Sequence, residues 1–197
     1  MERLGKKTVI VIFLILLIMS CSVPKYKYVT KNNYRELNDI INDYSNEYES
    51  NFPKNYDYEK IKNYTGHYKI GNPYVIDGKT YYPREDKSYK EVGIASWYGE
   101  EFHNRRTANG ETYNMNDFTC AHRTLPLPSL VKITNLQNGK SMIVRVNDRG
   151  PFAKNRIVDV SKNVAKNLGF YIQGTTDVKV EFLEKETNDM LKYLNLK

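Results

Sequence analysis

Between residues 92 and 182 the chain repeats one pattern, in which short β-prone runs end at turn-forming residues. Residues 131–134, 141–146 and 178–182 alternate apolar with polar side chains, as strands with one buried face do. Asn138–Gly139 separates the first two runs and predicts a tight hairpin. Further β-prone runs occupy residues 92–98 and 157–160. Such a series of short strands favours a small closed β-barrel, and its periodicity fits an OB-like barrel equally well.

One short helix and a second hairpin are predicted at the edges of this region. Ser161 is suited to cap the start of a helix that runs to Leu168, and Gly169 is suited to end it. Asp77–Gly78 lies between two β-prone runs, where a type I′ turn needs positive φ at both central residues. The sequence therefore predicts an accessory hairpin ahead of the barrel.

The N-terminal sequence indicates the cellular compartment in which the protein acts. Residues 9–19 are all Val, Ile, Phe, Leu or Met and follow a basic start. This run is shorter than the about 20 residues that span a bilayer, and it fits the apolar part of a signal peptide. Ser20–Cys21 follows and resembles a lipobox, which predicts lipidation of Cys21 and a stable membrane anchor through several acyl chains. Ser22 suggests the outer membrane, facing the periplasm, by resemblance to proteobacterial sorting.

Composition narrows the class of partner. The net charge of +7 favours polyanionic surfaces such as nucleic acid, anionic lipid or acidic wall polymer, unless it only reflects codon bias. The export signal argues against nucleic acid, and the basic residues lie largely in the predicted tether. With Cys21 acylated, Cys120 is the one free thiol, and we expect it to be a small buried hydrophobe. The spacing of Cys and His predicts no metal site, and no cofactor is implied.

Three blocks place titratable side chains beside turn-forming residues at the edges of apolar runs. They are 93–99 with its continuation to 111, then 120–127, then 144–152. Glu111, His122 and Asp148 are therefore predicted to meet in one cleft. Each also has a plain structural interpretation: a solvated loop acid, a satisfied core histidine and a turn cap.

Together these blocks resemble the RlpA-like family of bacterial envelope lipoproteins, over residues 67–184. The resemblance implies a mainly β fold: a six-stranded double-psi β-barrel with one or two short helices and the accessory N-terminal hairpin. It divides the chain into a signal peptide (1–20), a Lys/Asn/Tyr-rich tether (21–64), the hairpin (65–90), the barrel (91–184) and a tail (185–197). The C-terminal glycan-binding repeat domain of many members is not expected in this chain, and Asn104 stands where the family usually has Gly.

The family also implies endolytic cleavage of the β-1,4 bond between N-acetylmuramic acid and N-acetylglucosamine, leaving 1,6-anhydro ends. Asp148 would be the catalytic acid and base, Glu111 would assist, and His122 would orient one of the two acids. Because two carboxylates that share a site raise one pKa, Glu111 would help to keep Asp148 protonated. Strand alternation predicts that Arg149 points away from Asp148, and Phe152 is expected in the core. The predicted substrate contacts are Trp97, Tyr98, His103, Arg106, Thr107, Asn109, Asn147 and Arg149.

A different class of function remains open at this point. Barrels of this kind also bind or loosen polysaccharide, so the chain is alternatively a non-catalytic wall-binding lipoprotein. The expected partners are peptidoglycan glycan strands and, through Cys21, the membrane, with the protein acting as a monomer. Recruitment by division proteins is left undecided by the sequence.

Overall fold

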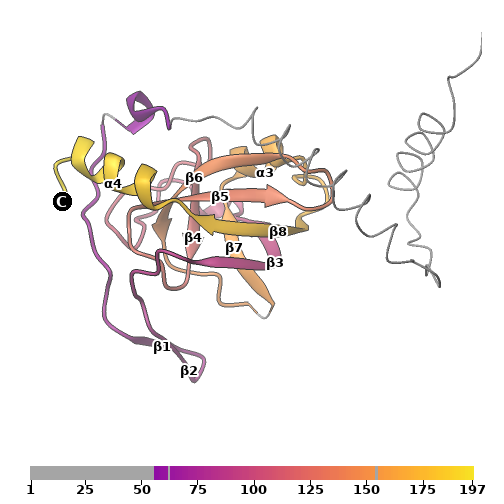
Figure 1. Cartoon of the computed structure of the whole chain (residues 1–197). Helices are drawn as coiled ribbons and strands as arrows, with labels where there is room; N and C mark the ends of the chain where they lie inside the picture. Colours follow the sequence, from indigo (N-terminus) through magenta and orange to yellow (C-terminus); the bar gives the residue numbers. More distant parts are fainter. Residues whose placement is uncertain (1–55, 62, 154) are drawn as a thin grey trace, which may run out of the picture. The chain divides into compact units, whose positions relative to one another are not determined.

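The computed structural model of the chain describes residues 56–61, 63–153 and 155–197 (Figure 1). The predicted signal peptide, Cys21 and most of the predicted tether lie outside the described residues. Within those three ranges, no helix is both long enough and apolar enough to cross a membrane.

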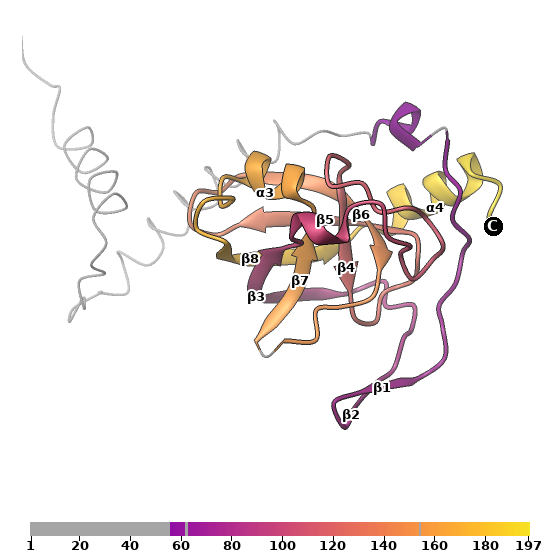
Figure 2. The same ribbon diagram turned by 180° about the vertical axis from the view of Figure 1, so that it is seen from behind.

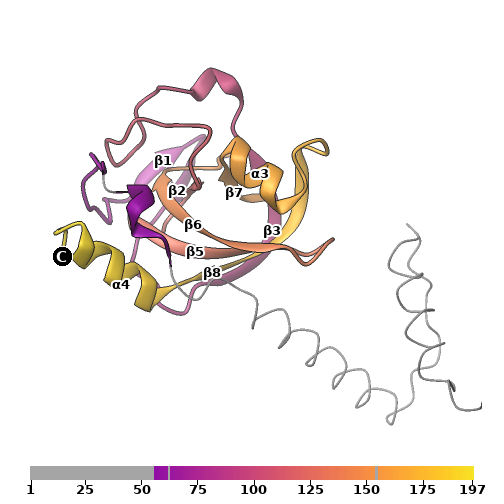
Figure 3. The same cartoon turned by 90° about the horizontal axis from the view of Figure 1, so that it is seen from above.

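Six strands close into a barrel in the order β3-β7-β4-β6-β5-β8 (Figure 3). The β3–β7 and β4–β6 pairs are parallel, and the other neighbours are antiparallel. The prediction of a six-stranded barrel is therefore confirmed. The strands are β3 (Lys90–Trp97), β4 (Thr119–His122), β5 (Ser129–Asn135), β6 (Ser141–Asp148), β7 (Arg156–Val160) and β8 (Thr175–Phe182).

The barrel interior is filled by small and branched side chains. Val158 and Val160 on β7, Val144 and Val146 on β6, and Cys120 on β4 all belong to one buried cluster. Each fully buried aliphatic side chain contributes about 1.5–3 kcal/mol. Cys120 is fully buried, as expected for a small hydrophobe. All four residues of strand β4 are buried, so the strand shows no alternation of apolar and polar residues. For that reason the sequence pattern did not predict this strand.

The turn chemistry reads directly from the sequence. Helix α3 (Lys162–Leu168) starts at Ser161, whose hydroxyl accepts a hydrogen bond from Val164 N, and it ends at Gly169 with φ 79°. In the accessory hairpin, β1 (Tyr74–Ile76) and β2 (Lys79–Tyr81) pair across Asp77 and Gly78. These two residues have φ of 50° and 75°, as the predicted turn requires.

The hairpin projects beyond the barrel strands (Figures 1 and 2). Aromatic side chains connect it to the loop after β6. Phe152 packs edge-on against Tyr74 and Tyr81, with ring centroids 6.1 and 5.7 Å away. Its side chain is 37% exposed, so the expectation that Phe152 lies in the core is wrong. It holds the hairpin instead of filling the barrel.

Both ends of the described chain pack against the barrel. The predicted tail forms helix α4 (Glu184–Tyr193), which buries Thr187, Met190 and Leu191. The 3-10 turn η1 (Tyr58–Ile61) lies within the predicted tether, and Ile61 joins Met190 in a second buried cluster. The rings of Tyr58 and Tyr193 stack 5.3 Å apart. The last part of the predicted tether is thus part of the folded domain. A second 3-10 turn, η2 (Glu100–Phe102), follows β3.

Candidate active site

A β-bulge places Asp148 on the outer face of the barrel. In the parallel β4–β6 pair, Cys120 is opposite Val146, but the next β4 residue, Ala121, is opposite Asp148. Two residues of β6 therefore span one step of β4, which reverses the alternation at Asn147. Cys120 and Val146 face the buried cluster, so Ala121 and Asp148 lie on the opposite face.

The Asp148 carboxylate is held by its surroundings. Its Oδ1 atom accepts hydrogen bonds from the backbone N–H groups of Ala108 and Arg149, both at 2.8 Å. The Tyr98 hydroxyl donates to Oδ2 at 3.4 Å. Burial raises the pKa of the Asp148 carboxyl above its ordinary value, although these three donors pull it downward. The result is an oriented acid with one oxygen held firmly and the other less constrained.

Glu111 belongs to the loop that contacts Asp148, but its own partners are different. Its Oε1 accepts from Asn109 Nδ2 at 2.8 Å, and its Oε2 forms an ion pair with Arg145. Thr107 donates to Asn109 Oδ1 and so closes the loop on itself. Ala108 lies within this loop. The Glu111–Arg145 pair therefore helps to hold in place the Ala108 N–H group that donates a hydrogen bond to Asp148.

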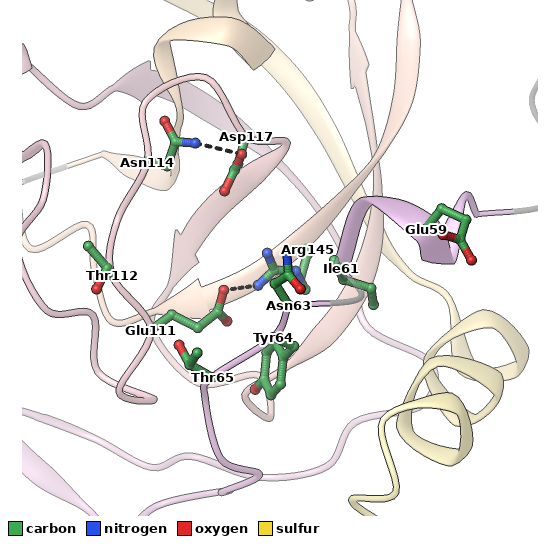
Figure 4. A pocket seen from close by; sticks show the side chains of 10 residues that line it. All are labelled: Glu59, Ile61, Asn63, Tyr64, Thr65, Glu111, Thr112, Asn114, Asp117 and Arg145. Atoms are coloured by element: carbon green, nitrogen blue, oxygen red, sulfur yellow. Dashed lines mark hydrogen bonds and ion pairs between the residues drawn. The ribbon is translucent and has the colours of Figure 1, made fainter.

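The N-terminal segment forms a wall beside this ion pair (Figure 4). The hydroxyl of Tyr56 hydrogen-bonds to Arg145, and the Tyr64 hydroxyl accepts from Asn109 Nδ2 at 2.9 Å. The Arg145 guanidinium also lies 5.6 Å from the centre of the Tyr64 ring. Beside these groups is a mostly polar cavity of about 450 Å³, which Asn63, Thr65, Thr112 and Asn114 help to line. No pattern in the sequence predicted that residues of the tether reach this site.

His122 faces away from both acids. It follows Ala121 on β4 and is opposite the core residue Val158 on β7, so its side chain lies on the face of the sheet away from Asp148. Its Nδ1 accepts from the N–H groups of Thr124 and Leu125, which leaves the proton on Nε2, 2.8 Å from the Tyr89 hydroxyl. Burial lowers the pKa of His122 to about 3, with help from Arg123 and Arg149. The structure therefore gives His122 structural partners in place of the expected contact with Asp148 or Glu111.

Arg149 also has protein partners. Its guanidinium donates to the carbonyl oxygens of His122 (3.2 Å), Leu125 (2.7 Å) and Ile70 (2.7 Å). Its side chain is directed away from Asp148, as alternation suggested, and it ties the loop after β6 to the segment before the hairpin. With these donors engaged, Arg149 acts as a brace for the site more than as a contact for substrate.

The other predicted substrate contacts divide into two groups. Thr107, Asn109 and Asn147 are buried and belong to the frame of the site. Arg106 and His103 are more accessible, with Arg106 Nη1 donating to the Gly110 carbonyl at 2.5 Å. Trp97 is half-buried with its ring 4.8 Å from Tyr171, and the half-buried Tyr98 points its hydroxyl at Asp148.

This arrangement suits proton transfer. A half-buried carboxyl with a raised pKa, oriented by backbone donors, can give a proton to a bound group and take one back. The described part of the chain contains no group of three or more His, Cys, Asp or Glu side chains that could hold a metal ion.

Comparisons with known proteins indicate the family of the chain. Residues 90–180 match the lytic transglycolase family model. Over 196 residues the chain is 47% identical to "Endolytic peptidoglycan transglycosylase RlpA" of Rickettsia felis, covering 97% of this chain and 78% of that protein. It is 59% identical to the protein of the same name in Pseudomonas aeruginosa strain UCBPP-PA14, over 57% of this chain and 33% of that one. Among solved structures, the Streptomyces papain inhibitor has a TM-score of 0.42 and 18% identity, covering 51% of this chain and 99% of the inhibitor.

Proposed function

Because this chain belongs to the RlpA-like family of lytic transglycolases, we propose that it is an endolytic peptidoglycan transglycosylase with Asp148 as its acid and base. The observation that carries the assignment of Asp148 is its position: a half-buried carboxyl on the outer face of the barrel, oriented by two backbone N–H groups. The chain spans 78% of the Rickettsia felis relative and 33% of the Pseudomonas aeruginosa one. The activity of the whole relatives is therefore transferred as a proposal.

The proton is expected on Oδ2, because Oδ1 already accepts two N–H groups. Asp148 gives this proton to the glycosidic oxygen between N-acetylmuramic acid and N-acetylglucosamine. The bond to the anomeric carbon breaks, and the 4-hydroxyl of N-acetylglucosamine leaves. Asp148, now a carboxylate, takes the proton of the muramoyl 6-hydroxyl as that oxygen attacks the anomeric carbon. A 1,6-anhydro ring forms, Asp148 is protonated again and no water is consumed, so one acid/base group completes the cycle.

For Glu111 we propose a positioning role in place of direct assistance. Its charge is matched by Arg145, and it accepts a further hydrogen bond from Asn109. These contacts stabilise the loop that presents the Ala108 N–H to Asp148. Burial, and not a neighbouring carboxylate, is the largest contribution to the raised pKa of Asp148.

The test is product release by the full-length chain from purified glycan strands, followed by mass spectrometry of the fragments. Asp148→Asn is expected to lower the release of anhydro-ended fragments by about 10²–10⁴-fold, the usual worth of a general acid and base. Asp189→Asn on the outer helix α4 is the matched control and should keep the wild-type rate. An Asp148→Asn rate equal to wild type would refute the assignment. Glycan binding by the wild type without any fragment release would instead indicate the non-catalytic wall-binding function.

We also propose that the protein acts at the cell envelope as a monomer, lipid-anchored through Cys21 to the outer membrane and facing the periplasm. The basic, apolar and Ser-Cys pattern of residues 3–21 supports this proposal. In cells fed a labelled fatty acid, Cys21→Ala should abolish incorporation of the label and release the protein from the membrane fraction. Retention of both the label and the membrane location in this variant would contradict the lipidation.

A further inference from the structure

Strand register aligns a second acidic residue with Asp148. Across the barrel wall, Asp148 is opposite Ala121, Ala121 is opposite Asp159 on β7, and Asp159 is opposite Ser96 on β3. These four residues form one row across β6, β4, β7 and β3. The flanking positions, such as Val146, Cys120 and Val160, face the buried cluster, so the row lies on the outer face with Asp148.

The separation of the two acids suits a shared substrate. Two strand spacings put their backbones about 10 Å apart, and carboxyl groups about 5–10 Å apart can act on opposite sides of one glycosidic bond. The residue between them in the row, Ala121, is small, and a Cβ on Gly150 would lie 3.7 Å from the Ala121 methyl. With φ at 135°, Gly150 holds a conformation that other residues rarely adopt.

The Tyr98 hydroxyl connects the two acids electrostatically. Burial raises the pKa of this hydroxyl first of all, and the nearby carboxylates of Asp148 and Asp159 raise it further. Tyr98 therefore lies within reach of both charges.

Two partners of Asp159 favour its anionic form. Its Oδ1 accepts from the Ser96 hydroxyl at 2.6 Å, and Arg156 lies 3.2 Å from Oδ2. Although burial raises the pKa of Asp159, Ser96 and Arg156 act in the opposite direction. The side chain is 13% exposed, so it is not sealed from a ligand. The titratable and charged groups that interact electrostatically with one or both acids are Tyr98, Tyr113, Cys120, Arg149 and Arg156.

We propose that Asp159 is the second acidic group of the active site, and that its negative charge stabilises the positive charge that develops on the anomeric carbon as Asp148 protonates the leaving oxygen. This role rests on the proposed transglycosylase function. It differs from the structural interpretation, in which Asp159 only ties β7 to β3 through Ser96. Asp148 carries out both proton transfers of the lytic reaction, so the contribution of Asp159 is electrostatic and not acid–base.

The test compares three variants of the full-length chain with wild type on purified glycan strands. Asp159→Asn keeps the shape and the bond to Ser96 but removes the charge. It should lower kcat about 10²–10³-fold, as loss of one transition-state electrostatic contact does, with KM nearly unchanged. The alkaline limb of its pH–rate profile should move to lower pH by about 0.3–1 unit, because Asp148 loses a neighbouring negative charge. Asp159→Glu should recover part of kcat.

Ser96→Ala is the matched control, because it breaks the bond between Ser96 and Asp159 but keeps the charge. It should keep kcat within about threefold of wild type, since a hydrogen bond of this kind contributes little more than 1 kcal/mol. Wild-type kcat and pH profile in Asp159→Asn would overturn the inference while leaving the proposed function intact. Equal losses in Asp159→Asn, Asp159→Glu and Ser96→Ala would also overturn it, by indicating a structural role. A wild type that releases no fragments would instead refute the proposed function, and this inference with it.

Discussion

The buried Glu111–Arg145 pair gives the sharpest stability prediction. The two side chains belong to residues only 7% and 5% exposed, and they form an ion pair beneath the N-terminal segment. Replacing Arg145 with Met removes the cation and leaves the buried carboxylate of Glu111 without its partner. Breaking a buried pair in this way typically costs about 3–5 kcal/mol, far more than the up to about 1 kcal/mol of an exposed pair.

The magnitude follows from the contacts that disappear. Arg145 also donates a hydrogen bond to the hydroxyl oxygen of Tyr56 and lies over the ring of Tyr64, so its removal loosens three neighbours at once. We therefore expect Arg145→Met to fall at the upper end, about 4–5 kcal/mol. Glu111→Gln keeps the shape and the acceptor for Asn109, and we expect it to cost about 3 kcal/mol. The double variant should cost at least about 1 kcal/mol less than the sum, because neither buried group is then left as an unpaired charge.

The assay is urea unfolding of the wild type, the two single variants and the double variant, all at pH 7. Lys185→Met in the exposed Lys185–Asp189 pair is the matched control, and it should change stability by less than about 1 kcal/mol. If the loss of stability in the double variant equals the sum of the two single-variant losses within about 0.5 kcal/mol, the two residues are not coupled. That result would also remove the proposed route by which Glu111 positions the Ala108 N–H for Asp148.

Three further predictions follow from single contacts. Tyr98→Phe removes a donor that lowers the pKa of Asp148, so the alkaline limb of the pH–rate profile should move to higher pH; an unchanged limb would show that this hydroxyl does not act on Asp148. His122 has a folded pKa of about 3, below its ordinary value, so the wild type should lose stability as pH falls from about 6.5 toward 3. In His122→Gln that part of the pH dependence should vanish from acid-range urea titrations, and its persistence would contradict the buried neutral assignment. Ser161→Ala removes the cap of α3 and should cost about 1 kcal/mol in thermal unfolding, whereas a cost near zero would mean that the cap is not formed in solution.

Much of the fold could be predicted because its turns and helix ends are determined by residues close together in the sequence. Asp77–Gly78 and the Ser161 and Gly169 caps act within a few residues of sequence, so the pattern and the structure agree. Strand β4 could not be found in this way, because it is buried throughout and shows no alternation. The order of the six strands depends on long-range pairing, and no local pattern predicted it. The double-psi barrel itself was expected from the family resemblance and not from the periodicity.

The candidate site was only partly predictable for the same reason. The side-chain direction of Asp148 depends on the bulge at Asn147, which is defined by pairing with β4 and has no local signal. Asp159 read as an ordinary polar position of a strand, and only its register with Ala121 connects it to Asp148. His122 looked catalytic by its type and surroundings in sequence, but the strand points its ring toward Tyr89.

The N-terminal wall was missed because its composition resembles a spacer. Tyr56 and Tyr64 lie among Lys, Asn and Asp residues with few aliphatic neighbours. The Tyr56 hydroxyl forms a hydrogen bond with Arg145 and the Tyr64 hydroxyl forms one with Asn109. Both partners are more than 40 residues later in the chain. Arg145 itself carried a weak signal, since a charged residue in a strand that is otherwise buried needs a partner.

The most direct test of the central claim is the titration of Asp148 itself. Carbon NMR of the carboxyl groups, assigned with Asp148→Asn, gives its pKa in the full-length chain, and the same samples give the pH dependence of kcat/KM on glycan strands. We predict a pKa above the about 3.9 of an ordinary Asp, and loss of activity as pH rises through that same value. An Asp148 carboxyl that titrates at or below the ordinary value, or activity indifferent to its titration, would contradict the account.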